Sequence, residues 1–271
     1  MPDARVLVVE DNEEVAEMLV VFFGSRGLKV TVAGDGHTAL RQIRDSLPTL
    51  ILLDVGLPDI DGYELFKKFR QSARTRYIPV IFLTRRSRKT DRIAGLELGA
   101  DDFITKPFDL EELYLRVQNA VDRAARENMT NPHTGLPGER AAREAMAEAK
   151  KDPNQAVLQF TLRHSGDFRD LYGALAGRDL LRYTALLINR VLNAVGTPDD
   201  FLGQLSEETF VVITAGERAG AIRQHVVDRF NHDAVQHYSL GEREGDRIRV
   251  KTSAGEEQVL PLIGLEALPA A

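Results

Sequence analysis

Runs of apolar residues that stop at a polar side chain recur through the N-terminal half of the chain. Runs of this length that alternate with helix-like segments indicate parallel strands covered by helices on both faces. Ligands bind such sheets beyond the carboxyl ends of the strands, so the polar residues that end the runs should meet at one edge. These residues are Glu10 and Asp11 after residues 6–9, Asp54 after residues 50–53, Thr84 after residues 80–83, and Lys106 after residues 103–105.

The residue types at this edge fit a phosphoryl group and a hard divalent cation. Glu10, Asp11 and Asp54 form a cluster of like charges that a cation would neutralise, and Mg²⁺ prefers carboxylate oxygens. A carboxylate can also accept a phosphoryl group and form an aspartyl-phosphate. Lys106 and the hydroxyl of Thr84 would offset the charge of that group. Each residue taken singly would be interpreted as a solvated loop, but the set in this order favours a phosphoryl site.

Four motifs make residues 4–123 resemble the receiver domain of two-component response regulators. They are Val8–Asn12, Leu53–Gly62, Thr84 and Gly99–Phe108. The resemblance implies an α/β, flavodoxin-like, doubly wound fold with a parallel five-stranded sheet. It also implies that a sensor histidine kinase phosphorylates Asp54, and that the receiver catalyses only its own phosphorylation and dephosphorylation.

The same resemblance assigns roles to the residues around the phosphorylation site. Thr84 and Lys106 are implied to bind the phosphate, and Phe103 matches the switch aromatic that turns inward when the threonine moves toward the phosphate. Composition alone would place Phe103 in the core. The implied Mg²⁺ ligands are Glu10, Asp11, Asp54 and the backbone carbonyl of Gly56.

The residue after the threonine departs from the family pattern, which has a small residue there. It is Arg85, and residues 85–89 carry four cations in five positions. One interpretation is a solvated basic loop before the next helix. The other is that Arg85 or Arg86 reaches the phosphoryl group, or shields it from water, and so lengthens the life of the phosphorylated state.

Composition limits the remaining function classes. A chain of 271 residues has room for two domains, and the lack of cysteine excludes disulfides and thiol chemistry. With no signal peptide and no apolar run of membrane-spanning length, we expect a cytoplasmic protein that makes no membrane contact. The net charge of −6 argues against a broad nucleic-acid surface, so we expect no DNA binding.

Helical spacing of apolar residues predicts five receiver helices, of which the last overruns the core. They are expected at residues 13–25, 37–46, 62–72, 90–98 and 109–128. This organisation gives a receiver domain at 1–123, a helical linker at 124–132 and a second domain at 133–271. Charged residues on or beside the fourth and fifth helices mark either ordinary solvation or a homodimer face, as in many receiver relatives. They are Arg92, Asp101, Asp102, Glu112 and Arg116.

The second half predicts an α/β or α+β domain with a helix at 138–151 and further helices at 175–195 and 217–231. Strands are expected at 155–162, 200–205, 210–214, 247–252 and 258–265. The order of these elements resembles the nucleotidyl-cyclase-like GGDEF domain of diguanylate cyclases. The segments that carry this resemblance are His133–Gly138, Phe168–Gly173 with Gly177, Phe201–Leu205 and Phe210–Ile213.

The positions that matter for cyclase chemistry depart from that family. The Gly-Gly-Asp/Glu-Glu-Phe signature reads Ser206-Glu207-Glu208-Thr209-Phe210, which lacks both glycines that let the backbone approach a triphosphate. The metal aspartates fall at Thr161 and Arg163. The guanine-reading residues fall at about Arg169 and Arg178, and arginine accepts no hydrogen bond. The Arg-x-x-Asp product site reads Thr197–Asp200, without the arginine.

The sequence therefore predicts a response regulator whose degenerate GGDEF-like domain is not an enzyme and signals by protein interaction or dimerisation. Three alternatives remain: an active or divergent diguanylate cyclase, an effector that binds a nucleotide or cyclic dinucleotide, and a transcription regulator. The lack of a basic helix in residues 131–271 argues against the last.

Overall fold

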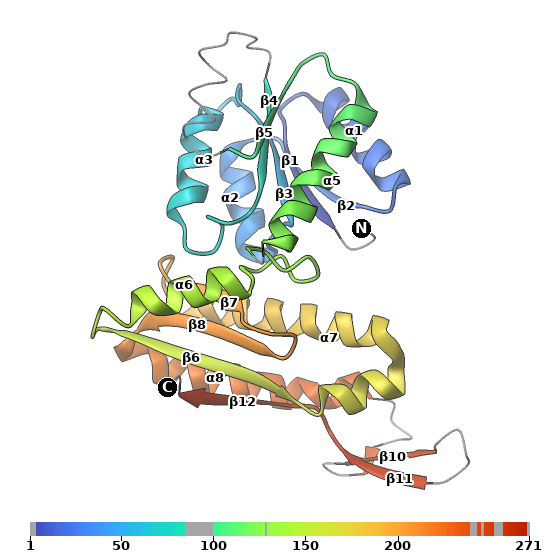
Figure 1. Ribbon diagram of the computed structural model, residues 1–271, viewed down its shortest axis with the longest axis vertical. Helices are drawn as coiled ribbons and strands as arrows, with labels where there is room; N and C mark the ends of the chain where they lie inside the picture. The colour runs from blue at the N-terminus through green and yellow to red at the C-terminus, as the bar shows by residue number, and fades with distance from the viewer. Residues whose placement is uncertain are drawn as a thin grey trace. The chain divides into compact units, whose positions relative to one another are not determined.

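The structure is a computed structural model that describes residues 4–84, 100–127, 129–238, 243–244, 247–251 and 257–269. The chain divides into two compact units, residues 1–144 and 145–271 (Figure 1). The N-terminal unit therefore includes the segment expected as a linker and the first part of the next helix. The domain limits inferred from sequence, with a linker at 124–132, stay predictions.

A parallel five-stranded sheet with the order β2-β1-β3-β4-β5 forms the centre of the N-terminal unit. This is the flavodoxin-like order, so the predicted fold of the first domain is confirmed. Helices α1 and α5 cover one face, and α2 and α3 cover the other (Figure 1). The strands are β1 (Arg5–Val9), β2 (Lys29–Ala33), β3 (Leu50–Asp54), β4 (Val80–Thr84) and β5 (Asp102–Thr105), and the helices are α1 (Glu13–Ser25), α2 (Gly36–Asp45), α3 (Gly62–Gln71) and α5 (Leu110–Arg126).

Burial explains why the apolar runs predicted these strands. Every residue of β3 and β4 is buried, as expected for central strands covered on both faces. The edge strand β2 instead alternates between exposed and partly buried residues until it ends at the buried Ala33. The fourth helix, expected at 90–98, lies outside the described residues.

Asparagine and aspartate side chains cap the described helices of this sheet at their N-termini. Each cap accepts a hydrogen bond from a backbone N–H of the first turn, which would otherwise lack a partner. Because each helix begins just past the carboxyl end of a strand, the caps fix the loops around the expected site. The capping residues are Asn12 for α1, Asp35 for α2, Asp61 for α3 and Asp109 for α5.

The loop from β3 to α3 closes tightly because residue 62 is glycine. A Cβ at Gly62 would lie 2.4 Å from the carbonyl oxygen of Asp54 and 2.7 Å from the Cα of Val55. The N–H of Gly62 also donates to the carbonyl of Val55 at 2.9 Å. The start of α3 therefore packs directly against the strand end that carries Asp54.

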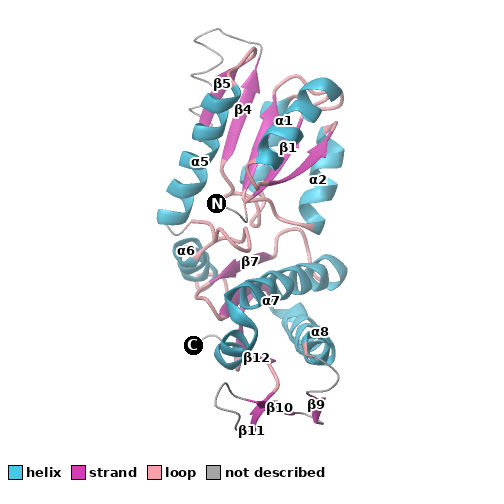
Figure 2. Ribbon diagram, turned by 90° about the vertical axis from the view of Figure 1, so that its right-hand side faces the viewer, coloured by secondary structure: helices cyan, strands magenta, loops and turns pink. Residues whose placement is uncertain are grey.

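The C-terminal unit contains an antiparallel four-stranded sheet with the order β12-β6-β8-β7 and a three-stranded sheet with the order β11-β10-β9. Helices α7 and α8 pack on one face of the four-stranded sheet (Figure 2). Helix α6 (Glu139–Ala149) precedes this sheet in the chain. The other elements are β6 (Gln155–Arg163), α7 (Ser165–Val195), β7 (Phe201–Gln204), β8 (Thr209–Ala215), α8 (Gly216–Ala234), a 3₁₀ turn (Val235–His237), β9 (Arg243–Glu244), β10 (Arg247–Lys251), β11 (Glu257–Pro261) and β12 (Gly264–Pro269).

Two expectations for this unit are wrong in detail. Helix α7 begins at Ser165 rather than 175, because a kink at Gly173, with φ +86°, separates its first turns from the regular pattern. The single strand expected at 258–265 is two strands, β11 and β12, in different sheets. The break falls at Ile263, whose N–H donates to the hydroxyl of Tyr238 at 2.8 Å.

No helix in the part of the chain that the structure describes has the length and apolar character needed to cross a membrane.

Replacing Gly62 by alanine should lower the free energy of unfolding of the N-terminal unit by about 1–3 kcal/mol, because the new Cβ overlaps backbone atoms. Gly24→Ala is the matched control, since a Cβ there meets nothing within 4 Å. In the helix it should be neutral or stabilise by up to about 1 kcal/mol. Urea unfolding followed by circular dichroism measures both, and equal midpoints would contradict the close packing.

Candidate functional site

The strand register brings the predicted residues to one edge of the sheet. Glu10 follows β1, Asp54 and Thr84 end β3 and β4, and Lys106 follows β5. Because these strands are parallel and adjacent in the order β1-β3-β4-β5, their carboxyl ends lie side by side. The register pairs Val9 with Leu53, Asp54 with Leu83, and Thr84 with Thr105.

The ammonium of Lys106 links two buried carboxylates at this edge. Its Nζ lies 2.5 Å from Oε2 of Glu10 and 2.6 Å from Oδ2 of Asp54. The three side chains are 9% exposed for Lys106, 1% for Glu10 and 9% for Asp54. At this depth each charge needs a partner, so the lysine holds both acids in place.

The Asp54 carboxylate is held at both oxygens. Oδ1 accepts from the backbone N–H of Gly56 at 3.1 Å, while Oδ2 accepts from Lys106. Two different donors on the two oxygens fix the plane of the carboxylate. The Asp54 carboxylate is therefore held in one orientation at the end of a fully buried strand.

Glu10, Asp11 and Asp54 form an acidic cluster whose carboxylate oxygens lie within 4.8 Å of one another. Burial, together with the charge of Asp54, raises the pKa of Glu10 above its ordinary value, against the opposing effect of Lys106. The ionised form of Glu10 is therefore disfavoured even with Lys106 beside it. Asp11 is exposed, and a hard divalent cation with carboxylate and water ligands fits these oxygens.

Thr84 and Phe103 lie beside the acidic cluster in the buried part of the unit. Thr84 is 2% exposed and Phe103 is 8% exposed. The Phe103 ring stacks on Phe82 with centroids 5.0 Å apart and an angle of 16° between the planes. The structure therefore places Phe103 inward, where composition alone would also put it, and its switch role stays a prediction.

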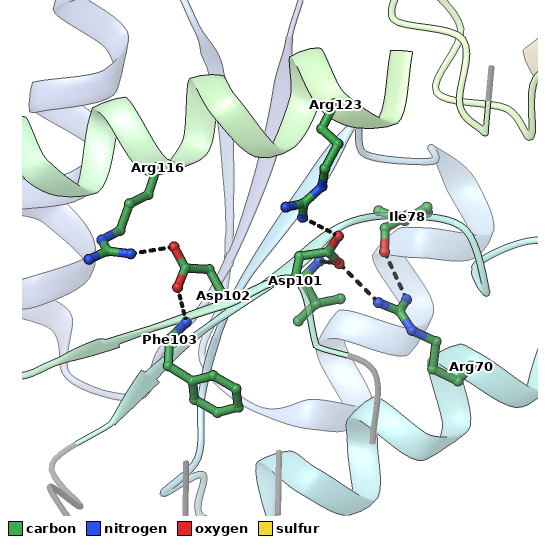
Figure 3. A network of polar contacts seen from close by, with 8 residues as sticks. Arg70, Ile78, Asp101, Asp102, Phe103, Arg116 and Arg123 are labelled. Carbon is green, nitrogen blue, oxygen red and sulfur yellow. Dashed lines mark hydrogen bonds and ion pairs between the residues drawn. The ribbon is translucent and has the colours of Figure 1, made fainter. Parts of the chain in front are cut away.

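The aspartate before Phe103 connects that residue to α5 (Figure 3). Oδ1 of Asp102 accepts from the N–H of Phe103 at 2.8 Å, and Oδ2 pairs with Nη1 of Arg116 at 2.5 Å. Arg116 also pairs with Glu112 one turn earlier on α5, at 2.7 Å. Asp102, Glu112 and Arg116, for which the sequence left open ordinary solvation or a homodimer face, are thus paired within one chain.

Asp101 forms a second network that the sequence did not predict. Figure 3 shows its carboxylate between Arg70 of α3 and Arg123 of α5, at 3.2 and 2.9 Å. The same carboxylate accepts from the N–H of Val80 at 3.0 Å, and Arg70 donates to the carbonyl of Ile78 at 2.8 Å. The signal available in the sequence was an aspartate pair at the start of β5 and two arginines seven residues apart on α5.

Asp35, His37 and Asp59 are a second titratable cluster that was not predicted. Asp59 accepts from the backbone N–H groups of Gly36 and His37, each at 2.9 Å. Burial opposes ionisation of Asp59, but these bonds and the His37 ring lower its pKa to about 2. The cluster therefore serves as the N-terminal cap of α2.

Residues Ser206–Phe210, which the sequence predicted to be a degenerate signature, lie in the C-terminal unit, at the hairpin between β7 and β8. Glu208 accepts from the hydroxyl of Ser165 at 2.5 Å, and Glu207 lies 3.5 Å from the guanidinium of Arg169. Thr209 Oγ1 is 3.4 Å from Oγ1 of Thr161 on β6, and Phe210 is fully buried.

Arg85, Arg86 and Arg92 lie outside the described residues. The proposed site-modulating role of Arg85 and Arg86, and the contribution of Arg92 to a dimer face, stay predictions.

Asp101→Asn should lower the free energy of unfolding of the N-terminal unit by about 2 kcal/mol, because it removes the carboxylate charge that pairs with the guanidinium of Arg70. Burial already lowers the pKa of Arg70, and Asp101 opposes that effect. The neighbouring change Asp102→Asn is the control: its pair with Arg116 is more exposed, so the loss should be under about 1 kcal/mol. Urea unfolding compares the two, and a larger effect at Asp102 would refute the ranking.

Comparison with known proteins covers the N-terminal part of the chain. Residues 6–118 match the response regulator receiver domain family. The regulatory protein VanRc of Enterococcus gallinarum is 39% identical over 124 residues, which is 46% of this chain and 52% of that protein. The phosphate regulon transcriptional regulatory protein PhoB of Escherichia coli K12 is 41% identical over 119 residues, which is 44% of this chain and 52% of PhoB. The chain thus spans about half the length of these curated relatives.

A solved structure, the Francisella response regulator 1452 receiver domain, is 35% identical and matches 44% of this chain and 98% of its own, with a TM-score of 0.42. The family match and the relatives agree with the sheet order and with the acidic cluster at its carboxyl edge. The N-terminal unit of this chain is therefore a receiver domain of the two-component response regulator family.

Proposed function

We propose that the chain is a response regulator that accepts a phosphoryl group on Asp54 from a sensor histidine kinase. The observation that carries this proposal is the Asp54 carboxylate at the end of β3, held by Lys106 and Gly56 beside the acidic cluster. Asp54 attacks the phosphorus, so a bond forms between its Oδ and phosphorus while the bond to the donor's histidine nitrogen breaks.

Residues already in place support that transfer. The ammonium of Lys106 pairs with the carboxylate of Asp54 and would offset negative charge on the transferring group. Thr84 ends the neighbouring strand and supplies a hydroxyl for a phosphoryl oxygen. Glu10, Asp11, Asp54 and the carbonyl of Gly56 are the proposed ligands of Mg²⁺, which when bound neutralises the acidic cluster and the phosphoryl oxygens.

Phosphorylation would bias the receiver between two states. Movement of Thr84 toward the phosphate would change the packing of Phe103, which already lies inward against Phe82. The family resemblance gives Phe103 this switch role. Because Asp102 holds both the Phe103 N–H and Arg116, a shift of this strand changes the pairing on α5. The altered α5 surface would serve a homodimer formed with the fourth helix, or contacts with another protein.

Acetyl phosphate with Mg²⁺ should phosphorylate the full chain on one residue, and Asp54→Asn should abolish the modification, because an amide cannot form the acyl phosphate. Asp59→Asn is the control, since Asp59 caps α2 in the same loop and should leave the modification intact. Mass spectrometry measures both variants. Phosphorylation that survives in Asp54→Asn, or that needs no divalent cation, would refute the assignment.

For the C-terminal unit, we propose a degenerate GGDEF-like output domain without cyclase turnover. The acidic residues of its signature are engaged with other side chains: Glu208 with Ser165, and Glu207 with Arg169. Glu207 adds negative charge where a triphosphate would lie, and arginine at the guanine-reading positions offers no acceptor. The alternatives are a divergent cyclase and a domain that binds a nucleotide without turnover.

The names of several relatives describe transcriptional regulators, but the family match in this chain ends at residue 118, before the C-terminal unit begins at residue 145. We therefore propose no DNA-binding role for that unit, in keeping with the net charge of −6. A salt-dependent shift of DNA mobility by the purified chain would overturn this choice.

The full chain incubated with GTP and Mg²⁺ or Mn²⁺ should form no cyclic di-GMP, because the glycines, metal aspartates and guanine readers are all replaced. An active diguanylate cyclase in the same assay is the positive control, and product that Glu208→Gln removes would establish a divergent cyclase. Light scattering then measures the mass of the chain with and without beryllofluoride, which distinguishes dimerisation from interaction with another protein. A doubled mass supports dimerisation, and an unchanged mass supports interaction with another protein.

A further inference from the structure

The chain that follows α5 folds back on itself into a closed loop, residues 129–138, called the strap below. Thr130 and Pro137 form a β-bridge, and the N–H of Asn131 donates to the carbonyl of Leu136 at 2.8 Å. The side chain of Asn131 accepts from the N–H groups of residues 133 and 134, at 2.9 and 3.0 Å. Thr130, Thr134 and Leu136 are no more than 5% exposed, so the strap is packed rather than solvated.

A single arginine of the receiver sheet holds this strap. The guanidinium of Arg5, the first residue of β1, donates to the carbonyls of His133 and Thr134, at 2.9 and 2.6 Å. It also donates twice to the carbonyl of Leu47, at 3.0 and 3.1 Å. The planar fork of arginine suits this task, because one rigid group reaches three carbonyls that a lysine could not satisfy together.

The closeness of the strap to the receiver requires glycine at position 135. Gly135 has φ +74°, a conformation that other residues rarely adopt. A Cβ there would lie 2.6 Å from Nη2 of Arg5, 2.9 Å from the carbonyl oxygen of Leu47 and 3.1 Å from that of Pro48. Two of these three atoms belong to the backbone before β3 and cannot move aside easily.

The strap lies at the opposite edge of the sheet from Asp54. Arg5 begins β1, and Leu47 and Pro48 precede β3, whereas Asp54 ends β3. Helix α5 runs back from the carboxyl edge to this one, and the N–H of Met129 in the strap donates to the carbonyl of Ala124 on α5, at 3.0 Å. One continuous set of contacts thus runs from Phe103 through Asp102 and Arg116 to α5 and the strap.

We propose that the strap, locked by Arg5 and Gly135, joins the receiver and the start of α6 into one rigid body, which carries the receiver's conformational change to the C-terminal unit. A flexible tether would pass on no orientation, whereas a packed connection passes on rotation of α5. The locking part stands on the contacts described here. The signalling part rests on the proposed function.

Hydrogen exchange of the full chain, without a phosphate analogue, tests the lock. Gly135→Ala should make the amides of residues 129–138 exchange about tenfold faster or more, because their bonds open locally. Gly27→Ala is the matched control: its φ is +80°, yet a Cβ there meets nothing within 4 Å. It should leave the strap unchanged, and unchanged exchange in Gly135→Ala would overturn the lock.

Arg5→Lys is the second variant, for the case in which Gly135→Ala fails to fold. It keeps the charge but loses the fork, so the same amides should again exchange faster. Lys29→Arg is its control, because Lys29 pairs with Arg5 in the sheet register and this change likewise keeps the charge at the same edge. An effect of Lys29→Arg equal to that of Arg5→Lys would show that any substitution in this strand pair loosens the strap, and it would overturn the assigned role of Arg5.

Beryllofluoride with Mg²⁺ tests the signalling part. In the wild type it should slow exchange around Asp54 and change exchange in residues 145–271. In Gly135→Ala the first effect should stay and the second should be lost. A C-terminal response that persists in a variant with a loosened strap would overturn the signalling part. If beryllofluoride does not slow exchange around Asp54 in the wild type, the proposed function is refuted. The lock is tested separately, by the exchange measured without the analogue.

Discussion

The arrangement of the receiver depends on one buried ammonium between two buried carboxylates. Without Lys106, the buried carboxylates of Glu10 and Asp54 would repel each other where solvent screens them little. Because Lys106 follows β5, Glu10 follows β1 and Asp54 ends β3, this interaction connects the ends of strands across the order β1-β3-β4-β5. Burial is the main cause of the raised pKa of Glu10, and the charge of Asp54 adds to it against the effect of Lys106.

The same principle governs the face formed by β5 and α5. Two adjacent aspartates there pair with different arginines. Asp101 pairs with Arg70 and Arg123, and Asp102 pairs with Arg116. The first network joins α3, β4 and α5 and fixes the packing of the helices, while the second joins the N–H of Phe103 to α5. A rearrangement at Phe103 can therefore alter the exposed pairing of Arg116 without dissolving the network that holds the helices together.

Sequence patterns predicted the receiver well because its central strands are buried on both faces, which leaves continuous apolar runs such as 50–53. The strand-end rule then placed Asp54 and Lys106 together without any distance in hand. The strap left no comparable pattern, since Arg5 bonds to backbone carbonyls that every residue carries. In the C-terminal unit the kink at Gly173 interrupts the helical pattern, so the sequence did not predict the start of α7. A break at Ile263 divides an apolar segment that the sequence predicted to be one strand.

The strap also alters what a short connection between domains can do. Helix α5 has 17 residues and is about 25 Å long, so it spans the depth of the sheet from the phosphorylation edge to the edge that holds Arg5. If the residues after α5 were a flexible chain, they would not transmit a rotation of the helix. The guanidinium of Arg5 and the left-handed backbone of Gly135 instead keep the strap, residues 129–138, packed up to the start of α6. The packing of the strap therefore depends on α5, the element that Asp102 couples to Phe103.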